Sequence, residues 1–151
     1  MSKNKKLKIQ TPKAVLQPKK FQEKFFSLDF SCLTDDVRYN FYDMRKNGNI
    51  DFKSLRDFFN KLEKISLLSI AQISQLDRKN GFELLNRNNF KVKSIFSKID
   101  KKYPFTKDMA YHVFRFGAQE HRIICKQCEK EGYDTVLFVL AIDWDLSTYR
   151  H

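Results

Sequence analysis

The sequence predicts an α+β fold, in which N-terminal helices pack on a small antiparallel β-sheet formed mainly by the C-terminal third. Hydrophobic residues recur at helical spacing over residues 51–64, whereas residues 136–142 form the continuous apolar run that is typical of a strand buried on both faces. The 4 Gly and 3 Pro among 151 residues are too few for a sandwich or barrel with many tight turns. A chain of this length has room for one domain with its own core.

The N-terminal end differs in composition from the rest of the chain. Residues 1–20 carry seven Lys and no acidic residue, and Pro12 and Pro18 discourage regular structure there. We therefore expect a basic flexible arm over residues 1–20, followed by a single α+β domain over residues 21–151.

A strand and a short helix are expected before the first chain break. The dense apolar patch within residues 21–33 predicts a strand docked on the core. Thr34-Asp35-Asp36 supplies a cap for a short helix through Tyr39 and Phe41-Tyr42. Asn47-Gly48-Asn49 then interrupts the regular structure.

Residues 51–64 carry the strongest helical pattern in the sequence, and Asp51 is a suitable N-cap. The apolar residues that follow Asp51 at helical spacing are Leu55, Phe58, Phe59, Leu62 and Ile65. A second helix is expected over residues 68–76. In the segment 77–102, Phe82, Leu84 and Leu85 continue the helical pattern, so we expect a short helix and then a strand or an irregular basic stretch.

Three strands are expected after Pro104. The alternating segment 111–116, the short aliphatic segment 122–125 and the apolar run 136–142 each have strand character. The residues between the second and third, 126–135, are expected to form a hairpin loop. The last third is therefore predicted to be a three-stranded antiparallel meander onto which the helices pack.

The net charge of +11 is concentrated in two blocks: residues 1–20 contribute +7 and residues 77–102 contribute +5. Two separate basic blocks suit a phosphate backbone, because each neutralised phosphate releases a counterion. We expect RNA as the partner, with solubility or attraction to an anionic membrane surface as the alternative explanation. The expected nucleic-acid contacts are Lys3, Lys5, Lys6, Lys8, Arg87, Lys91, Lys93, Lys101, Lys102 and, by stacking, Trp144.

Localisation can be inferred from what the sequence lacks. No stretch approaches the roughly 20 consecutive apolar residues that span a bilayer, and no apolar segment of a signal peptide follows the N-terminal charges. The 3 Cys are an odd number without the framework of a secreted protein. We therefore expect a cytoplasmic protein that has no membrane as a partner.

The Cys125-Lys-Gln-Cys128 pair has the spacing of a half zinc site. With His121 it supplies three ligands, and His112 or His151 would be the fourth. There is no second Cys-x-x-Cys, and Cys125 lies inside a predicted strand, where a free thiol is normally buried. We expect no metal and no cofactor, with zinc as the alternative.

Histidine, arginine, aspartate and tyrosine gather in the C-terminal third, at His112, Arg115, His121, Arg122, Asp143, Asp145, Tyr149, Arg150 and His151. Such groups suit RNA cleavage by 2′-hydroxyl attack, which needs a base, a cation for the phosphate and an acid for the leaving oxygen. Strand alternation places His112 and Arg115 on opposite faces. The alternative is structural: Asp143 and Asp145 cap a turn and pair with Arg150 or Arg122, and the histidines are ordinary surface residues.

The pattern His112-Val-Phe-Arg-Phe, Arg122-Ile-Ile, Val136-Leu-Phe-Val-Leu-Ala-Ile and Tyr149-Arg150-His151 resembles the C-terminal half of the RelE/HigB-like toxins. These are small basic messenger-RNA endonucleases of bacterial toxin–antitoxin pairs. The resemblance implies a metal-independent endoribonuclease with an acidic antitoxin protein as a partner. It also implies roles in phosphate contact and proton transfer for Arg122, Tyr149 and His151, with His112 as a further catalytic candidate.

Two functions therefore compete. The first is a basic RNA-binding protein that acts as a toxin-like endoribonuclease, and the second is a non-catalytic binding module of a mobile element or phage, which holds nucleic acid or an acidic protein. No Gly-rich phosphate loop, Gly-x-Ser-x-Gly or His-Glu-x-x-His occurs, which argues against nucleotide hydrolysis, serine esterase and zincin chemistry.

Overall fold

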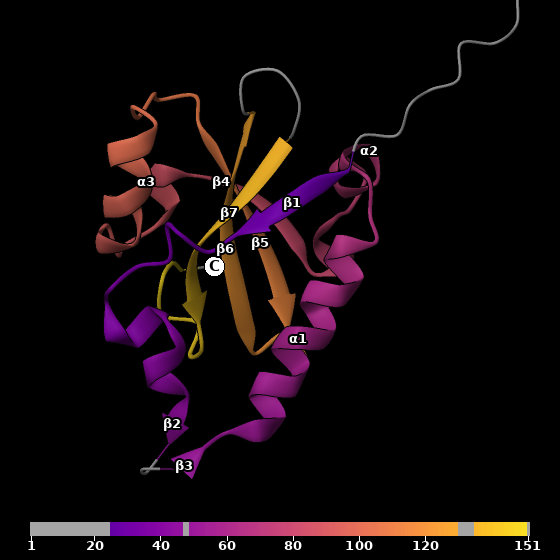
Figure 1. Ribbon diagram of the computed structural model, residues 1–151, viewed down its shortest axis with the longest axis vertical. Coiled ribbons are helices and arrows are strands. Elements are labelled where there is room, and N and C mark those ends of the chain that lie inside the picture. The colour runs from indigo at the N-terminus through magenta and orange to yellow at the C-terminus, as the bar shows by residue number, and fades with distance from the viewer. Residues whose placement is uncertain (1–24, 47–48, 130–134, 151) are drawn as a thin grey trace, which may run out of the picture.

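The computed structural model describes residues 25–46, 49–129 and 135–150, which are organised around a five-stranded mixed β-sheet (Figure 1). The strand order is β1-β7-β6-β5-β4. The strands are β1 (Phe26–Asp29), β4 (Phe82–Asn86), β5 (Ala110–Phe116), β6 (His121–Glu129) and β7 (Thr135–Asp143). Helices pack against this sheet, so the predicted α+β class is confirmed. The expected basic arm lies outside the described residues.

The predicted C-terminal meander is present as β5, β6 and β7, each antiparallel to the next. All nine residues of β7 are buried, because this strand has a neighbour on each side and packed side chains on both faces. The prediction of a fully buried strand from the apolar run is therefore confirmed.

The strand expected within residues 21–33 is β1, which pairs with β7 in parallel, Phe26 lying opposite Thr135. The earliest described element thus joins the last strand of the chain. This parallel edge makes the sheet mixed, whereas the sequence predicted an antiparallel one.

Both predicted N-terminal helices are present, with bounds slightly different from those expected. Helix α1 (Phe52–Ser66) begins after Asp51, whose side chain accepts a hydrogen bond from the Ser54 N–H at 3.2 Å. Helix α2 (Ile70–Ser74) begins with a capping box formed by Ser69 and Gln72. Caps of this kind satisfy N–H groups that have no partner within the helix.

The short helix expected before residue 47 forms as two 3-10 turns, η1 (Val37–Tyr39) and η2 (Phe41–Met44), and Asp36 caps the first. A two-stranded ribbon follows, β2 (Arg45–Lys46) with β3 (Asn49–Ile50). Asn47 and Gly48 of the expected chain break lie outside the described residues.

The prediction for residues 77–102 is wrong in its order. After the 3-10 turn η3 (Arg78–Asn80), residues 82–86 form strand β4 and do not continue a helix; two further turns follow, η4 (Arg87–Asn89) and η5 (Ser94–Phe96), and then helix α3 (Ser97–Lys102). Pairing decides the outcome, because Phe82 and Leu84 lie opposite Phe114 and His112 of β5. Short apolar runs fit either structure, and the open edge of β5 selects the strand.

The predicted hairpin loop over residues 126–135 is also wrong in part. Strand β6 continues through Glu129, which pairs with Thr135 at the start of β7. A register shift between Ile124 and Cys125 accompanies this extension. Residues 130–134 lie outside the described residues.

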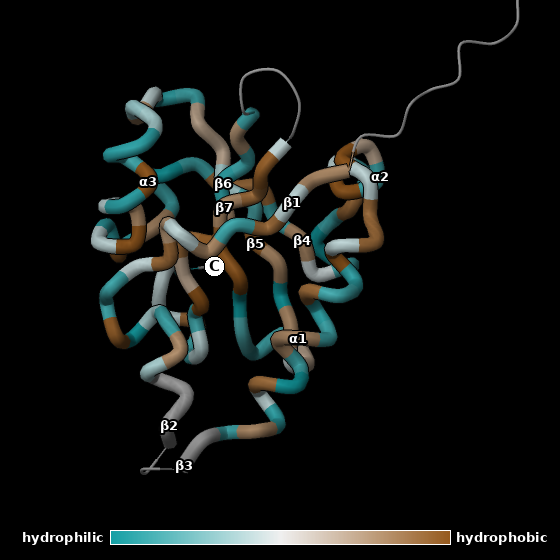
Figure 2. The backbone as a smooth tube through the Cα atoms, in the orientation of Figure 1, coloured by the Kyte–Doolittle hydropathy of each residue, from teal (hydrophilic) through white to brown (hydrophobic). Residues whose placement is uncertain are grey.

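Hydrophobic side chains fill both faces of the sheet. Against one face pack α1 and α2, with Phe58, Ile65 and Ile73 buried among β-strand residues. Against the other pack η5 and α3, with Phe96 and Ile99 buried. Figure 2 shows the corresponding apolar stretch of β7 and the alternation of apolar and polar residues along α1. None of the helices in the described ranges is long and apolar enough to cross a membrane.

Candidate functional site

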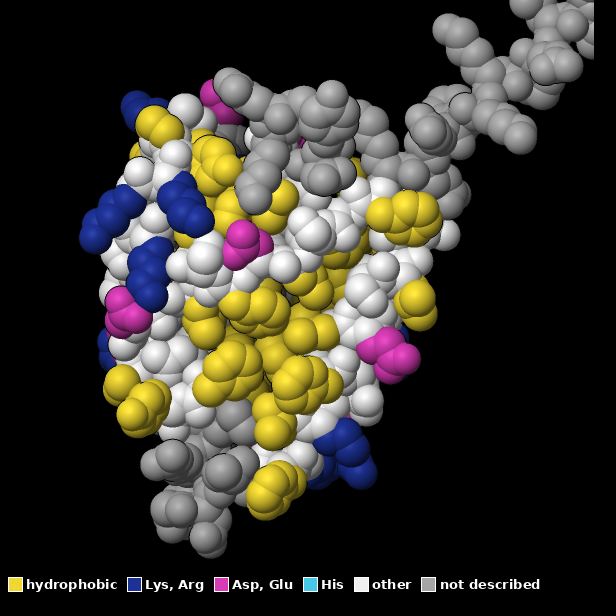
Figure 3. Space-filling model, viewed as in Figure 1, with side chains coloured by type: hydrophobic (Ala, Val, Ile, Leu, Met, Phe, Trp, Pro, Cys, Tyr) yellow, Lys and Arg dark blue, Asp and Glu magenta, His cyan; other side chains and the backbone are white. Residues whose placement is uncertain are grey.

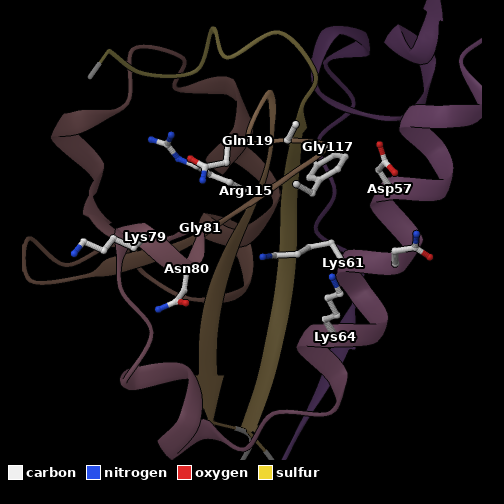
Figure 4. Close-up of a pocket in the computed structure, with 12 residues that line it drawn as sticks. Asp57, Lys61, Lys64, Lys79, Asn80, Gly81, Arg115, Gly117 and Gln119 are labelled. Atoms are coloured by element: carbon white, nitrogen blue, oxygen red, sulfur yellow. The ribbon is translucent and has the colours of Figure 1, made fainter.

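A pocket of about 380 Å³ opens between α1, the 3-10 turn η3 and the turn that joins β5 to β6 (Figure 4). Its lining residues are Asp57, Asn60, Lys61, Lys64, Lys79, Asn80, Gly81, Arg115, Phe116, Gly117, Ala118 and Gln119. Four of these are cations and one is a carboxylate. We call this cavity the cationic pocket.

Helix α1 supplies one wall of the cationic pocket through its periodicity. Its core stripe, which includes the buried Phe58 and Ile65, faces the sheet. Asp57, Lys61 and Lys64 are spaced four and three residues apart and therefore share a different face. Figure 4 shows Lys61 extending from α1 across the pocket. The amphipathic pattern that buries one face of α1 against the sheet thus also places two lysines at the cationic pocket.

The turn η3 supplies the opposite wall. The Asp77 side chain accepts hydrogen bonds from the Asn80 backbone N–H at 3.0 Å and from its side-chain amide at 2.8 Å. Gly81 ends the turn with a φ of 71°, and a β-carbon at this position would lie 3.7 Å from Lys61 Nζ. These contacts hold Lys79 and Asn80 at the rim of the pocket.

The floor includes three consecutive residues in the left-handed region, Gly117, Ala118 and Gln119, with φ of 59°, 55° and 68°. A β-carbon at Gly117 would lie only 2.6 Å from His121 Cδ2, so this position requires glycine. Ala118 and Gln119 adopt the same region at a steric cost of roughly 1 kcal/mol each. Such strain concentrates at binding sites more often than elsewhere.

The electrostatics of the cationic pocket favour an anion. Within the described part of the chain, no ion pair engages Lys61, Lys64 or Lys79. Burial lowers the pKa of Lys61, and the charge of Lys64 lowers it further. A bound anion would offset both effects, because it supplies the opposite charge that Lys61 lacks.

Arg115 connects the pocket to a polar cluster behind it. Its guanidinium contacts Glu83 at 3.1 Å, and Arg78 contacts the same carboxylate at 3.0 Å. The Tyr149 hydroxyl donates a short hydrogen bond to the other carboxylate oxygen. Burial alone would raise the pKa of Glu83, but the bond from Tyr149 and the charge of Arg115 lower it below its usual value. Glu83 is therefore held as a carboxylate.

Two of the predicted catalytic residues, Arg122 and Tyr149, lie together in this cluster. The Arg122 guanidinium carbon is 3.7 Å from the centre of the Tyr149 ring, and its Nη1 lies 3.3 Å from Asp143 Oδ2. Asp143 also accepts the backbone N–H groups of Ser147 and Thr148, both at 3.0 Å. Arg122 and Asp143 are both 0% exposed, so Arg122 reaches no surface of the protein as described.

The other two predicted catalytic residues lie elsewhere. His112 shares a sheet face with Phe114, as alternation predicted. The centre of its ring lies 6.4 Å from the centre of the Phe114 ring and 5.6 Å from that of the Phe82 ring. Burial lowers the pKa of His112 to about 4, with a smaller contribution from Lys126. His151 lies outside the described residues, so the structure brings together two of the four candidates.

The predicted nucleic-acid contacts are also divided. Lys91, Lys93, Lys101 and Lys102 are exposed on or near α3, away from the cationic pocket. Arg87 pairs with Asp100 and lies over the Phe96 and Phe105 rings. Trp144 is 6% exposed and donates its indole N–H to the Asn40 carbonyl at 2.7 Å. The predicted Lys3, Lys5, Lys6 and Lys8 lie outside the described residues.

The alternative zinc site finds no support in the geometry. Among the residues that the structure describes, no group of three or more His, Cys, Asp or Glu is placed to hold a metal ion. His121 Nδ1 donates to the Trp144 carbonyl at 2.6 Å, and its Nε2 lies 3.1 Å from Ser54 Oγ. Cys125 is buried, which raises its thiol pKa.

Sequence reasoning missed the cationic pocket as a unit. The spacing of Asp57, Lys61 and Lys64 on the polar side of α1 was visible, but it is also typical of an ordinary solvated helix face. Lys79 and Arg115 join them only through tertiary packing. The chain matches no family model, no curated protein and no solved structure.

Proposed function

We propose that this protein binds RNA and that the cationic pocket holds a phosphate of the RNA backbone. One observation carries the proposal: four cations from three parts of the chain converge on one cavity that contains a single carboxylate, Asp57. Three of the four are lysines without an ion pair in the described residues, so their charge is available to a ligand.

RNA is favoured over a small phosphate ester by the charge of the whole chain. The net charge is +11, of which residues 1–20 contribute +7 and residues 77–102 contribute +5. A single small anion needs only the pocket, whereas a polyanion gains from every additional basic block by releasing counterions. The exposed lysines near α3 and the basic N-terminal segment would then engage further phosphates.

Fluorescence anisotropy with a labelled single-stranded RNA, over a range of salt concentrations, tests this proposal. The variant Lys61→Gln with Lys64→Gln should weaken binding at least about tenfold and reduce the slope of log K against log salt by about 1. The comparison variant is Lys101→Gln with Lys102→Gln, which removes the same charge from α3 and, because α3 makes only the additional contacts, should weaken binding less than the pocket variant does. A control variant that weakens binding more than the pocket variant would assign the main contact to α3.

RNA cleavage is the second candidate function, and one observation favours it: Arg115 lines the pocket and contacts Glu83, which in turn accepts the Tyr149 hydroxyl. In the expected reaction the 2′-hydroxyl attacks the adjacent phosphorus, forms a 2′,3′-cyclic phosphate and releases the 5′-hydroxyl of the next nucleotide. Glu83, which is kept ionised, would accept the proton of the attacking hydroxyl, Arg115 would stabilise the crowded phosphate, and a water molecule would protonate the leaving 5′ oxygen.

Cleavage is tested by inducing the chain in a bacterial host and mapping new ends in total RNA. Growth arrest with new ends, lost in Glu83→Gln and in Arg115→Gln variants that still fold, would support a toxin-like endoribonuclease, whose natural partner would be an acidic antitoxin. Binding without cleavage would instead favour the non-catalytic binding module. Either activity would take place in the cytoplasm, where the three cysteines remain free thiols.

A further inference from the structure

Helix α1 carries an apolar stripe that faces away from the protein. Phe52, Phe59 and the C-capping Leu67 are 73%, 56% and 72% exposed. Their spacing of seven and eight residues places them on one side of the helix, apart from the core stripe of Phe58 and Ile65. Large apolar side chains aligned in this way are typical of an interface.

Two opposite charges lie within the same stripe. Arg56 and Glu63 are both exposed, and neither has an ion pair in the described ranges of the chain. They are placed symmetrically about the midpoint between Phe59 and Asn60: Arg56 is as far before it as Glu63 is after it. Phe52 and Leu67 are symmetric about the same point.

We infer that two copies of this chain associate through antiparallel packing of α1 against α1 of the second copy. In this arrangement Arg56 of each copy lies opposite Glu63 of the other, Phe52 lies opposite Leu67, and the two Phe59 side chains meet at the two-fold axis. The contact is isologous, as in most homodimers, because the same surface is used on both sides. At 1.5 Å per residue, the 15-residue helix offers an interface about 22 Å long.

A second copy fits this surface better than an unrelated partner does. The stripe carries one charge of each sign, so a copy of itself, turned by 180°, matches both, whereas an acidic or a basic partner would match only one. Phe30 and Phe41, which are 36% and 39% exposed and contact the Phe58 ring, extend the apolar surface beside the helix. Figure 3 shows hydrophobic side chains gathered on this face, with acidic and basic side chains beside α1.

The dimer leaves the cationic pocket open. Asp57, Lys61 and Lys64 line that pocket from another side of α1, and Asn60, which also lines it, lies between the pocket and the stripe, so an RNA would meet one pocket in each copy. This inference does not depend on RNA binding, and the double variant Lys61→Gln with Lys64→Gln should remain dimeric.

Sedimentation equilibrium of the full chain, with charge-reversal variants, tests the arrangement. The unmodified chain should shift from 18.1 kDa to twice that mass as its concentration rises. Arg56→Glu and Glu63→Arg should each weaken the dimer at least about tenfold, since each places like charges opposite one another. The double variant, Arg56→Glu with Glu63→Arg, should restore dimerisation, because it exchanges the two charges and keeps their complementarity.

Thermal unfolding of each variant is the control for folding, and both charged side chains are exposed, so their reversal should leave the monomer intact. A chain that stays monomeric up to about 1 mM would overturn the proposal. Single reversals without effect would also overturn it, since the dimer would then use another surface. Failure of the double variant to recover would overturn the antiparallel register.

Discussion

The cationic pocket and the cluster around Arg122 are neighbours in the sheet, since Arg115 pairs with Arg122 across β5 and β6, yet they treat positive charge in opposite ways. Arg122 is fully buried and lies against Asp143 and the Tyr149 ring. The lysines of the pocket form no ion pair in the described structure, and Asp57 is the one carboxylate that lines the pocket with them. A cation that is paired internally serves the fold, whereas cations gathered without partners are available to a ligand.

The largest expected effect is the loss of stability on removing Arg122. Replacing Arg122 with Met leaves Asp143 buried without its cation, which should lower the free energy of unfolding by about 3–5 kcal/mol in urea denaturation. A loss below about 1 kcal/mol, together with loss of RNA cleavage, would contradict the structural role and support the catalytic role that the sequence resemblance implies. For this reason Arg115, and not Arg122, is the better target for testing the chemistry.

The next largest effect is the dependence of stability on pH that His112 causes. His112 lies on the face of the sheet opposite to that of Arg122. The pKa of His112 is lowered to about 4, whereas in the unfolded chain it is about 6.5. The unfolded state therefore binds the extra proton first as the pH falls, and the stability present above pH 6.5 is lost towards pH 4. This difference in pKa corresponds to a loss of about 3 kcal/mol at 1.36 kcal/mol per pKa unit.

Urea denaturation of the unmodified chain and of His112→Leu, at several pH values, measures this effect. The difference between the two proteins isolates His112 from the carboxylates that titrate in the same range. The difference between their free energies of unfolding should change between pH 6.5 and pH 4. If it stayed constant, His112 would be accessible to protons and nearer to the surface than described.

A smaller effect is expected at the strained turn that floors the pocket. Gly117→Ala adds a β-carbon 2.6 Å from His121 at a φ of 59°, and should cost about 2 kcal/mol. Ala118→Gly, at a φ of 55°, should instead stabilise the protein by about 0.5–1 kcal/mol, because glycine relieves the strain. Equal effects of the two substitutions in thermal unfolding would contradict the described turn.

Local patterns predicted the elements better than their arrangement. The spacing of Leu55, Phe58 and Leu62 was sufficient for α1, and the apolar run 136–142 was sufficient for β7, because each pattern is complete within one element. Strand β4 was missed because Phe82, Leu84 and Leu85 become a strand only beside β5. The parallel pairing of β1 with β7 joins segments more than a hundred residues apart, which no local pattern encodes.

The candidate site shows the same limit. Arg122 and Tyr149 were expected together and do meet, but the burial that gives Arg122 its partner Asp143 depends on the register of three strands. The pocket lysines come from separate elements, and each taken alone has the sequence context of a solvated surface residue. Their convergence is a property of the tertiary fold.

The smallest expected effect on stability, that of replacing Lys61, distinguishes the cationic pocket from the cluster around Arg122 most directly. Because burial and Lys64 lower the pKa of Lys61, the charged form of Lys61 is less favourable in the native state than in the unfolded state, so its charge destabilises the fold. Lys61→Gln should therefore leave the free energy of unfolding unchanged or raise it by up to about 0.5 kcal/mol, while it weakens RNA binding.

Urea denaturation and RNA anisotropy on the same preparation measure both quantities. A loss of more than about 1 kcal/mol would place Lys61, like Arg122, among the residues that hold the fold. A gain in stability together with a loss in affinity is the result expected of a cation whose partner is the ligand.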